Sequence, residues 1–225
     1  MPLIMQKDLK TLSATENRDR MLAGKLYDPG EPTLMNEQQH YQQDLADYNQ
    51  LAFTDMAGRA QWLADHFASV GPDSYIEQPF YANWAGHHVH LGAAVYANYH
   101  LTLVDDGEIF IDDHVLLGPN VTLVTAGHPI DPQRRRAAYQ YNRPIHLKEN
   151  VWLGANVTVL PGVTIGENTV VGAGALVTKD LPANVVAIGT PAQVVRLITQ
   201  HDRDYYDHDQ PMDVTAPTQE ETHDN

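Results

Sequence analysis

An aliphatic side chain returns at every sixth position in the second half of the chain. The positions are Leu147, Leu153, Val159, Ile165, Val171 and Val177. A second small or aliphatic residue follows each of them by four places, as Val151 follows Leu147. A period of six fits neither a helix nor a simple strand, and a fixed period is the signature of a repeat architecture. We therefore expect short strands that point aliphatic side chains inward, turn at Gly or Asn, and stack about 4.8 Å apart as three-sided coils.

The same pattern is present, less regularly, from Leu91 to Leu123, with a slip of two residues near Gly107. It vanishes between residues 125 and 143 and then resumes. Loops of this length inside compact domains are usually functional or disordered. The sequence thus predicts a hexapeptide parallel β-helix from which a long loop, 125–143, leaves the coil.

Helical spacing of apolar residues precedes the repeats and predicts three helices that cover one end of the coil. Their expected limits are Ser13 or Thr15 to Gly24, roughly residues 34–52, and Thr54 to Gly71, the last helix carrying Leu63, Phe67 and Val70. The expected organisation is a flexible leader over 1–13, a helical cap over 14–72, the β-helix over 73–198, and an acidic, disordered tail over 199–225.

Charge and composition restrict the classes of function. The chain has 225 residues, 43% of them hydrophobic, and a net charge of −15. Eight acidic residues and one Arg lie between His201 and Asn225. An acidic balance argues against nucleic acid and anionic membranes as partners. The absence of cysteine excludes disulfides, thiolate metal sites and a cysteine nucleophile. No apolar run could span a bilayer and Met1 to Lys10 lacks a signal-peptide core, so we expect a cytoplasmic protein.

Histidine is frequent, with twelve residues that could suggest a metal site. Those in the tail, such as His201, are expected to be solvated. His87, His88 and His90 cluster where the coil begins. Neighbouring residues of a strand face opposite sides, so of these three only His88 and His90 share a side, and they lack the regular spacing of metal ligands. His128 stands where the coil breaks, and its neutral imidazole could accept a proton near neutral pH. On spacing alone, an anchoring role in the loop is about as plausible.

Two further polar or aromatic positions face outward in the repeat frame. Asn98 follows the inward Ala97, so it could bind a ligand or form a turn. Trp152 follows the inward Val151, as expected for packing at an interface. The chain has no phosphate loop, nucleophile elbow or thiol. Acyl transfer would therefore require direct attack by the substrate, assisted by one histidine and backbone amides.

Several blocks carry a resemblance to a known family. They are residues 21–28 (Met-Leu-Ala-Gly-Lys-Leu-Tyr-Asp), 96–106 with Leu-Val-Asp-Asp at its end, 118–123, 127–129 (Gly-His-Pro), 151–157, 161–166, 172–180 with Val-Thr-Lys-Asp, and 189–192. In these blocks the chain resembles the hexapeptide-repeat acetyltransferases, in particular the maltose/galactoside O-acetyltransferase group. The resemblance covers roughly residues 20–198.

This resemblance implies a left-handed parallel β-helix and a homotrimer with active sites between subunits. It also implies acetyl-CoA as co-substrate, a sugar hydroxyl as acceptor, and no required metal. By family position, His128 is the general base and Asn98 contacts both acceptor and acetyl group. Asp106, Asn83 and Asp28 fall where the group binds the acceptor.

On the donor side, the resemblance places seven residues along CoA: Trp152, Ala155, Ala173, Thr178, Lys179, Gln193 and Arg196. Lys179 and Arg196 suit the CoA phosphates in an otherwise acidic protein. Two of the positions depart from the family. Ala155 replaces a serine hydroxyl found in some relatives, which leaves only a backbone N–H for the oxyanion. Gln193 stands where a second CoA-binding Arg can occur, which predicts weaker phosphate contact.

Other functions remain open on the same fold. A γ-type carbonic anhydrase-like metalloenzyme would need three histidines on one metal, and His88, His90 and His128 match that spacing poorly. A non-catalytic assembly module would not need the Gly-His-Pro and Asp-Asp blocks. Gln140 in the loop leaves the acceptor preference undecided.

Overall fold

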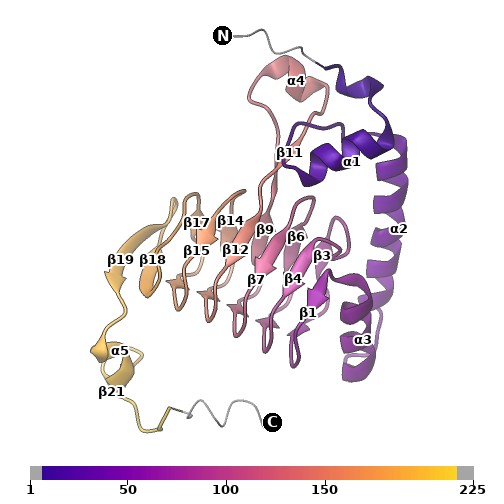
Figure 1. Ribbon diagram of the computed structural model, residues 1–225. Coiled ribbons are helices and arrows are strands. Elements are labelled where there is room, and N and C mark those ends of the chain that lie inside the picture. The colour runs from indigo at the N-terminus through magenta and orange to yellow at the C-terminus, as the bar shows by residue number, and fades with distance from the viewer. Residues whose placement is uncertain (1–6, 217–225) are drawn as a thin grey trace.

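Three parallel sheets form the sides of a coil, and helices cover one end of it (Figure 1). The computed structural model describes residues 7–216. The first sheet consists of β1 (Ser69–Val70), β4 (Val89–Leu91), β7 (Ile109–Ile111), β12 (Ile145–Leu147) and β15 (Thr164–Ile165). The second consists of β2 (Tyr75–Ile76), β5 (Tyr96–Ala97), β8 (Leu116–Leu117), β13 (Trp152–Leu153), β16 (Val170–Val171), β18 (Val185–Ile188) and the antiparallel β19 (Gln193–Leu197). The third consists of β3 (Tyr81–Ala82), β6 (Thr102–Val104), β9 (Thr122–Val124), β14 (Thr158–Val159) and β17 (Leu176–Val177).

The register of these strands explains the period of six. Leu147 lies opposite Ile165, so three hexapeptides complete one coil. Leu91 and Ile111 are partners twenty residues apart, because the slip near Gly107 adds two residues. Ile111 and Leu147 are partners across the loop, which adds the length of one coil without changing the register. All six predicted aliphatic positions are fully buried, which confirms the predicted β-helix.

The interruption of the repeat is an ordered hairpin. Strand β10 (Ala126–Gly127) pairs with β11 (Tyr141–Asn142), and α4 (Pro132–Arg136) lies between them. The hairpin leaves the coil beside the N-terminal helices (Figure 1). Two backbone hydrogen bonds of 2.9 and 3.1 Å join Gln140 to Tyr27, so the base of the loop is held against the segment that follows the first helix.

The helices are α1 (Ala14–Leu22), α2 (Pro32–Tyr48) and α3 (Met56–His66). Ser13, one of the two predicted caps, begins α1 through a capping box with Glu16. The other limits differ from the prediction. Asp55, not Thr54, caps α3. The helix also ends before Phe67, because Phe67 enters the core and Val70 already belongs to β1.

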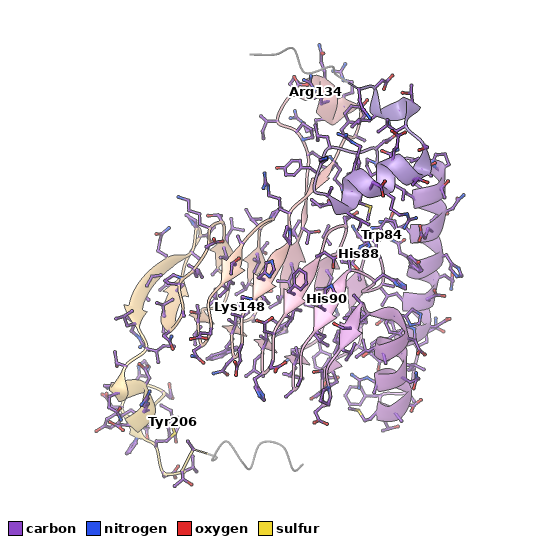
Figure 2. All side chains as sticks on the ribbon, in the orientation of Figure 1. Trp84, His88, His90, Arg134, Lys148 and Tyr206 are labelled. Carbon is purple, nitrogen blue, oxygen red and sulfur yellow. The ribbon has the colours of Figure 1, made fainter. Side chains whose placement is uncertain are left out.

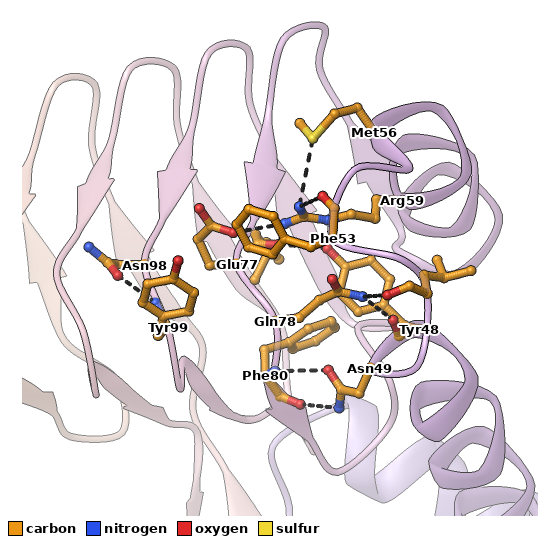
Figure 3. Close-up of polar contacts among 12 residues, drawn as sticks. Tyr48, Asn49, Phe53, Met56, Arg59, Glu77, Gln78, Phe80, Asn98 and Tyr99 are labelled. Carbon is orange, nitrogen blue, oxygen red and sulfur yellow. Dashed lines mark hydrogen bonds and ion pairs between the residues drawn. The ribbon is translucent and has the colours of Figure 1, made fainter.

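Polar contacts fasten α2 and α3 to the first coil (Figure 3). The buried guanidinium of Arg59 donates to the Ile76 carbonyl at 2.6 Å and pairs with Glu77 at 3.1 Å. Asn49 both donates to and accepts from the backbone of Phe80. The helices therefore cover the edges of the first strands, which would otherwise be open, and they fix the position of the loops beside them.

The ends of the chain differ in part from the expected organisation. The coil begins at β1, before residue 73. Within the expected leader, a 3₁₀ turn η1 (Leu9–Thr11) buries Leu9. Part of the tail forms α5 (Gln200–Asp204) and the hairpin of β20 (Tyr205–Tyr206) and β21 (Gln210–Pro211). Residues 1–6 and 217–225 lie outside the described residues. Within the described range, no helix is both long and apolar enough to cross a membrane.

Candidate active site

Asp106 lies in the turn after β6, and two side chains from the turn after β3 reach its carboxylate. The Asn83 amide donates to Oδ2 at 2.7 Å, and the Trp84 indole N–H donates to Oδ1 at 3.3 Å. The turns stack because β3 and β6 are neighbours in the third sheet. Figure 2 places Trp84 and His88 where the coil meets the helices. The structure thus brings together the predicted Asn83 and Asp106, and it adds Trp84, which the sequence analysis missed.

The segment after α1 lies against the same carboxylate. Burial raises the pKa of the Tyr27 hydroxyl, and the nearby charge of Asp106 raises it further. The following residue, Asp28, is buried, and its Oδ1 accepts from the Lys10 ammonium at 2.6 Å and from the Gly30 N–H at 3.0 Å. Asp28 thus follows a residue of the cluster in the chain, and its Oδ1 is engaged by Lys10 and Gly30 rather than by a cluster residue.

Loop residues close the cluster from the other side. Gln140 Nε2 donates to the Tyr27 hydroxyl at 2.5 Å. Asn142 Nδ2 donates to the Asp106 carbonyl at 2.7 Å and to the Met21 carbonyl at 3.3 Å. Tyr27 and Asn142 were not predicted. Tyr27 lies 113 positions from Gln140, and Asn142 lies 36 positions from Asp106 and 121 from Met21. No local pattern signals contacts over such separations.

His128 follows β10 in the loop. Its Nδ1 lies 2.9 Å from the Tyr139 carbonyl. A carbonyl only accepts hydrogen bonds, so Nδ1 carries the proton and Nε2 of the neutral ring has a free lone pair. The side chain is exposed. Its contact anchors the loop and at the same time directs a proton acceptor outward, so the two roles considered from the sequence are compatible.

Asn98 occupies a different turn, between the second sheet and the third. Its Oδ1 accepts from the Tyr99 N–H at 2.7 Å (Figure 3). Its Nδ2 donates to no other residue of the described part of the chain. The Oδ1 contact is the turn role considered from the sequence, and the amide nitrogen remains available to a ligand.

Ala155 and Ala173 continue this turn along the coil. A Cβ on Gly118 would lie 2.8 Å from the Ala155 nitrogen, and one on Gly154 would lie 2.7 Å from the Ala173 nitrogen. Glycine at these positions therefore allows neighbouring coils to approach closely beside these amides. Neither N–H donates a backbone hydrogen bond to another residue of 7–216. The turn consequently presents two free donors in line with Asn98.

The remaining donor-side residues are spread over three places. Trp152 is 51% exposed on the outer face of the second sheet. Thr178 and Lys179 are exposed in the turn after β17, on the same edge as Asp106. Gln193 and Arg196 are exposed on β19, where Arg196 pairs with Asp202. The single chain does not gather these residues into one site.

Four of the predicted residues lie at two opposite edges of the third sheet, which are the sides on which its strands begin and end. His128 and Asp106 lie at the edge where its strands end, and Asn98 and Ala155 lie where they begin. One strand and its flanking residues span the sheet between these two edges. At 3.3 Å per residue, the edges are about 15–20 Å apart. A base must approach its proton within about 3 Å. In this conformation of the chain, His128 and Asn98 therefore lie on opposite edges of the third sheet, farther apart than a contact with the same hydroxyl allows.

The three histidines considered for a metal make separate contacts. His88 Nδ1 donates to the Asp105 carbonyl at 2.6 Å, and His90 pairs with Glu108 at 2.8 Å. His128 lies in the loop. Among residues 7–216, no three His, Asp or Glu side chains form a group that could hold an ion.

Comparisons with known proteins cover most of the chain. Residues 144–179 match the family described as bacterial transferase hexapeptide (six repeats), and residues 20–71 match the maltose acetyltransferase hexapeptide capping motif. Galactoside O-acetyltransferase of Lactococcus lactis is 47% identical over 199 residues, which are 88% of this chain and 96% of that protein. Galactoside O-acetyltransferase of Escherichia coli is 40% identical over 188 residues, 84% of this chain and 92% of that protein.

Solved structures of galactoside and maltose acetyltransferases also superpose on most of this chain. A galactoside acetyltransferase in complex with coenzyme A superposes with a TM-score of 0.84 at 38% identity, covering 91% of this chain and all of the other. A maltose O-acetyltransferase from Clostridium difficile 630 superposes with a TM-score of 0.79 at 37% identity, covering 81% of this chain and 97% of the other.

Proposed function

The chain belongs to the hexapeptide-repeat galactoside and maltose O-acetyltransferase family, and from this premise we propose that it acetylates a sugar hydroxyl by direct attack on acetyl-CoA. The observation that carries the proposal is the free Nε2 of His128, in the loop that closes the Asp106 cluster. A neutral imidazole fixed by its other nitrogen is the arrangement that general-base catalysis requires.

In the proposed reaction, His128 Nε2 takes the proton of the acceptor hydroxyl as the oxygen attacks the thioester carbonyl carbon. The tetrahedral intermediate carries its negative charge on the former carbonyl oxygen. The carbon–sulfur bond then breaks, the ester is released, and the departing thiolate takes the proton from the imidazolium. No covalent enzyme intermediate forms, which agrees with the lack of cysteine.

The donor site follows the turn that holds Asn98. The free N–H of Ala155 is suited to the oxyanion, and that of Ala173 to an amide carbonyl of the pantetheine arm. Trp152 flanks this arm. Arg196 contacts the remainder of CoA, and Gln193 contributes a neutral contact where a second cation would strengthen phosphate binding. Thr178 and Lys179 lie on the edge of Asp106 and reach the same CoA from a neighbouring subunit.

The acceptor site is built from carboxylates and amides. Asp106, Asn83 and Asp28 provide oxygens and N–H groups that match sugar hydroxyls, which both donate and accept. Asn98 is proposed to contact the acceptor and the acetyl group together. This composition favours a neutral sugar or a similar small hydroxyl compound over an anionic acceptor, which the carboxylates would repel.

We further propose a homotrimer in which one subunit supplies Asn98 and the next supplies His128. The separation of these residues within one chain supports shared sites. The third sheet lies between the two edges, and its outer face carries the paired Thr102, Thr122 and Thr158. Small side chains let a neighbouring copy approach closely. The number three comes from the family resemblance.

The proposal is tested by following CoA release over a panel of acceptors: glucose, maltose, methyl β-galactoside, chitobiose and a sugar phosphate. Because the chain has no cysteine, a thiol reagent reports only CoA. We expect release that depends on at least one neutral sugar, with the acetyl ester detected by mass spectrometry. Release that is the same with and without every acceptor would contradict the proposal.

A further inference from the structure

Two adjacent aspartates at the end of β6 have different partners. Asp105 is completely buried, whereas Asp106 reaches the acceptor cluster. Each Asp105 oxygen accepts one backbone hydrogen bond, from the Trp84 N–H at 2.8 Å and from the Gly86 N–H at 2.9 Å. Asp105 thus holds both ends of the turn 84–86.

That turn needs support because its backbone is unusual. Ala85 has a φ of 52°, a region that L-residues other than Asn and Asp seldom adopt, and Gly86 has a φ of 90°. A Cβ on Gly86 would lie 2.2 Å from the ring of Phe67. The two hydrogen bonds to Asp105 offset this strain and fix where the Trp84 side chain begins.

The Trp84 ring extends from this turn toward the Asp106 carboxylate. It is only 3% exposed, so it does not touch an acceptor, but its N–H lies 3.3 Å from Asp106 Oδ1. Asn83 holds Oδ2 at 2.7 Å. One donor on each oxygen fixes the rotation of the carboxylate and leaves a lone pair on each oxygen for a hydroxyl.

We infer that Trp84 is a positioning residue for acceptor binding, which orients the Asp106 carboxylate and is itself held by Asp105. This inference rests on the proposed role of Asp106 toward the acceptor. Asp105 and Trp84 act through Asp106 and contact no reacting atom. The rigid turn makes the carboxylate ready for the acceptor before binding, so less ordering is required when the sugar arrives.

The test compares Trp84→Phe, which keeps the buried ring and removes the N–H, with Trp62→Phe as a matched control. Trp62 lies on α3, stacked on His66 and away from Asp106. For Trp84→Phe we expect kcat/KM for the acceptor to fall about tenfold, mainly through KM, while KM for acetyl-CoA stays within about twofold. Trp62→Phe should leave both constants near wild type.

A second measurement does not depend on the folding of Trp84→Phe. The chain has three tryptophans, so their indole N–H signals can be assigned by NMR. In Asp106→Asn, the Trp84 signal should shift while those of Trp62 and Trp152 remain in place. If the chemical shift of the Trp84 indole N–H is the same in Asp106→Asn as in the wild type, the inference is overturned.

The kinetics of Asp106→Asn distinguish the proposed acceptor-binding role of Asp106 from the inferred positioning role of Trp84. If this substitution leaves the acceptor KM unchanged, the proposed acceptor site itself is wrong. If it raises the acceptor KM but Trp84→Phe does not, the acceptor site stands and the positioning role of Trp84 is refuted. Equal losses in Trp84→Phe and Trp62→Phe would also refute it, because a general packing defect would then be the cause.

Discussion

Asp202 holds the guanidinium of Arg196 through two hydrogen bonds, Nη1 to Oδ2 at 2.8 Å and Nη2 to Oδ1 at 2.7 Å. This pairing lowers the pKa of Asp202 to about 2. The same fork geometry suits a phosphate. Because Arg196 is a proposed contact of CoA, the carboxylate of α5 occupies a position that a CoA phosphate would need, and the two anions compete for one cation.

Asp202→Asn should therefore strengthen CoA binding. Loss of the competing charge is expected to lower the Kd of CoA about two- to fivefold at low ionic strength, the range of an exposed ion pair. Isothermal titration calorimetry checks this, and added salt should reduce the difference. Asp204→Asn is the control, since Asp204 bonds Gln200 rather than Arg196. Weaker binding by Asp202→Asn would instead mean that Asp202 orients Arg196 for CoA.

His128→Ala should reduce kcat by about 10²–10⁴, the range for loss of a general base. The fold should survive, because the side chain is exposed and loses one hydrogen bond to Tyr139, about 1 kcal/mol. Steady-state kinetics and thermal unfolding measure the two effects. His40→Ala, an exposed histidine on α2, serves as the control. Turnover near wild type in His128→Ala would remove the proposed role.

The coil could be predicted from the sequence because its signal is local. Each hexapeptide carries its own inward residue, so Leu147 and Leu153 identify the core without knowledge of the rest of the fold. Helix limits were harder to predict. Phe67 and Val70 continue the spacing of α3, yet burial in the coil and pairing with β4 decide their conformation.

The site was predictable only where a residue stands at a recognisable position in a motif. Asp106 and His128 could be located in this way. Trp84 and Asn142 could not, because their roles come from hydrogen bonds to Asp106, 22 and 36 positions away along the chain. The hairpin of β10 and β11 is likewise held by Tyr27, which belongs to a distant segment.

Stability should depend on pH through Asp105. Burial raises the pKa of its carboxyl to about 6, against the lowering effects of the Trp84 N–H and of His88. The folded state then binds a proton that the unfolded state has released, so the contribution of Asp105 to the unfolding free energy falls as pH rises from about 4 to about 6. Urea unfolding of wild type and Asp105→Asn at fixed protein concentration measures this. The stability difference in favour of wild type should shrink over this interval, and a difference that grows would contradict the assignment.

Mixing two inactive variants tests whether neighbouring subunits share the site. His128→Ala and Asn98→Ala each remove one half, and the structure places the halves at opposite edges of the third sheet. If the site lies between copies, subunits dissociated, mixed in equal amounts and reassembled should regain about one active site in four, because some interfaces combine the intact Asn98 of one chain with the intact His128 of the next. Acetyl transfer by the reassembled mixture measures this. Mixing without dissociation is the control and should show no recovery. If mass spectrometry detects mixed oligomers but activity stays absent, each site must be formed within one chain, and the loop that carries His128 would have to fold across the third sheet.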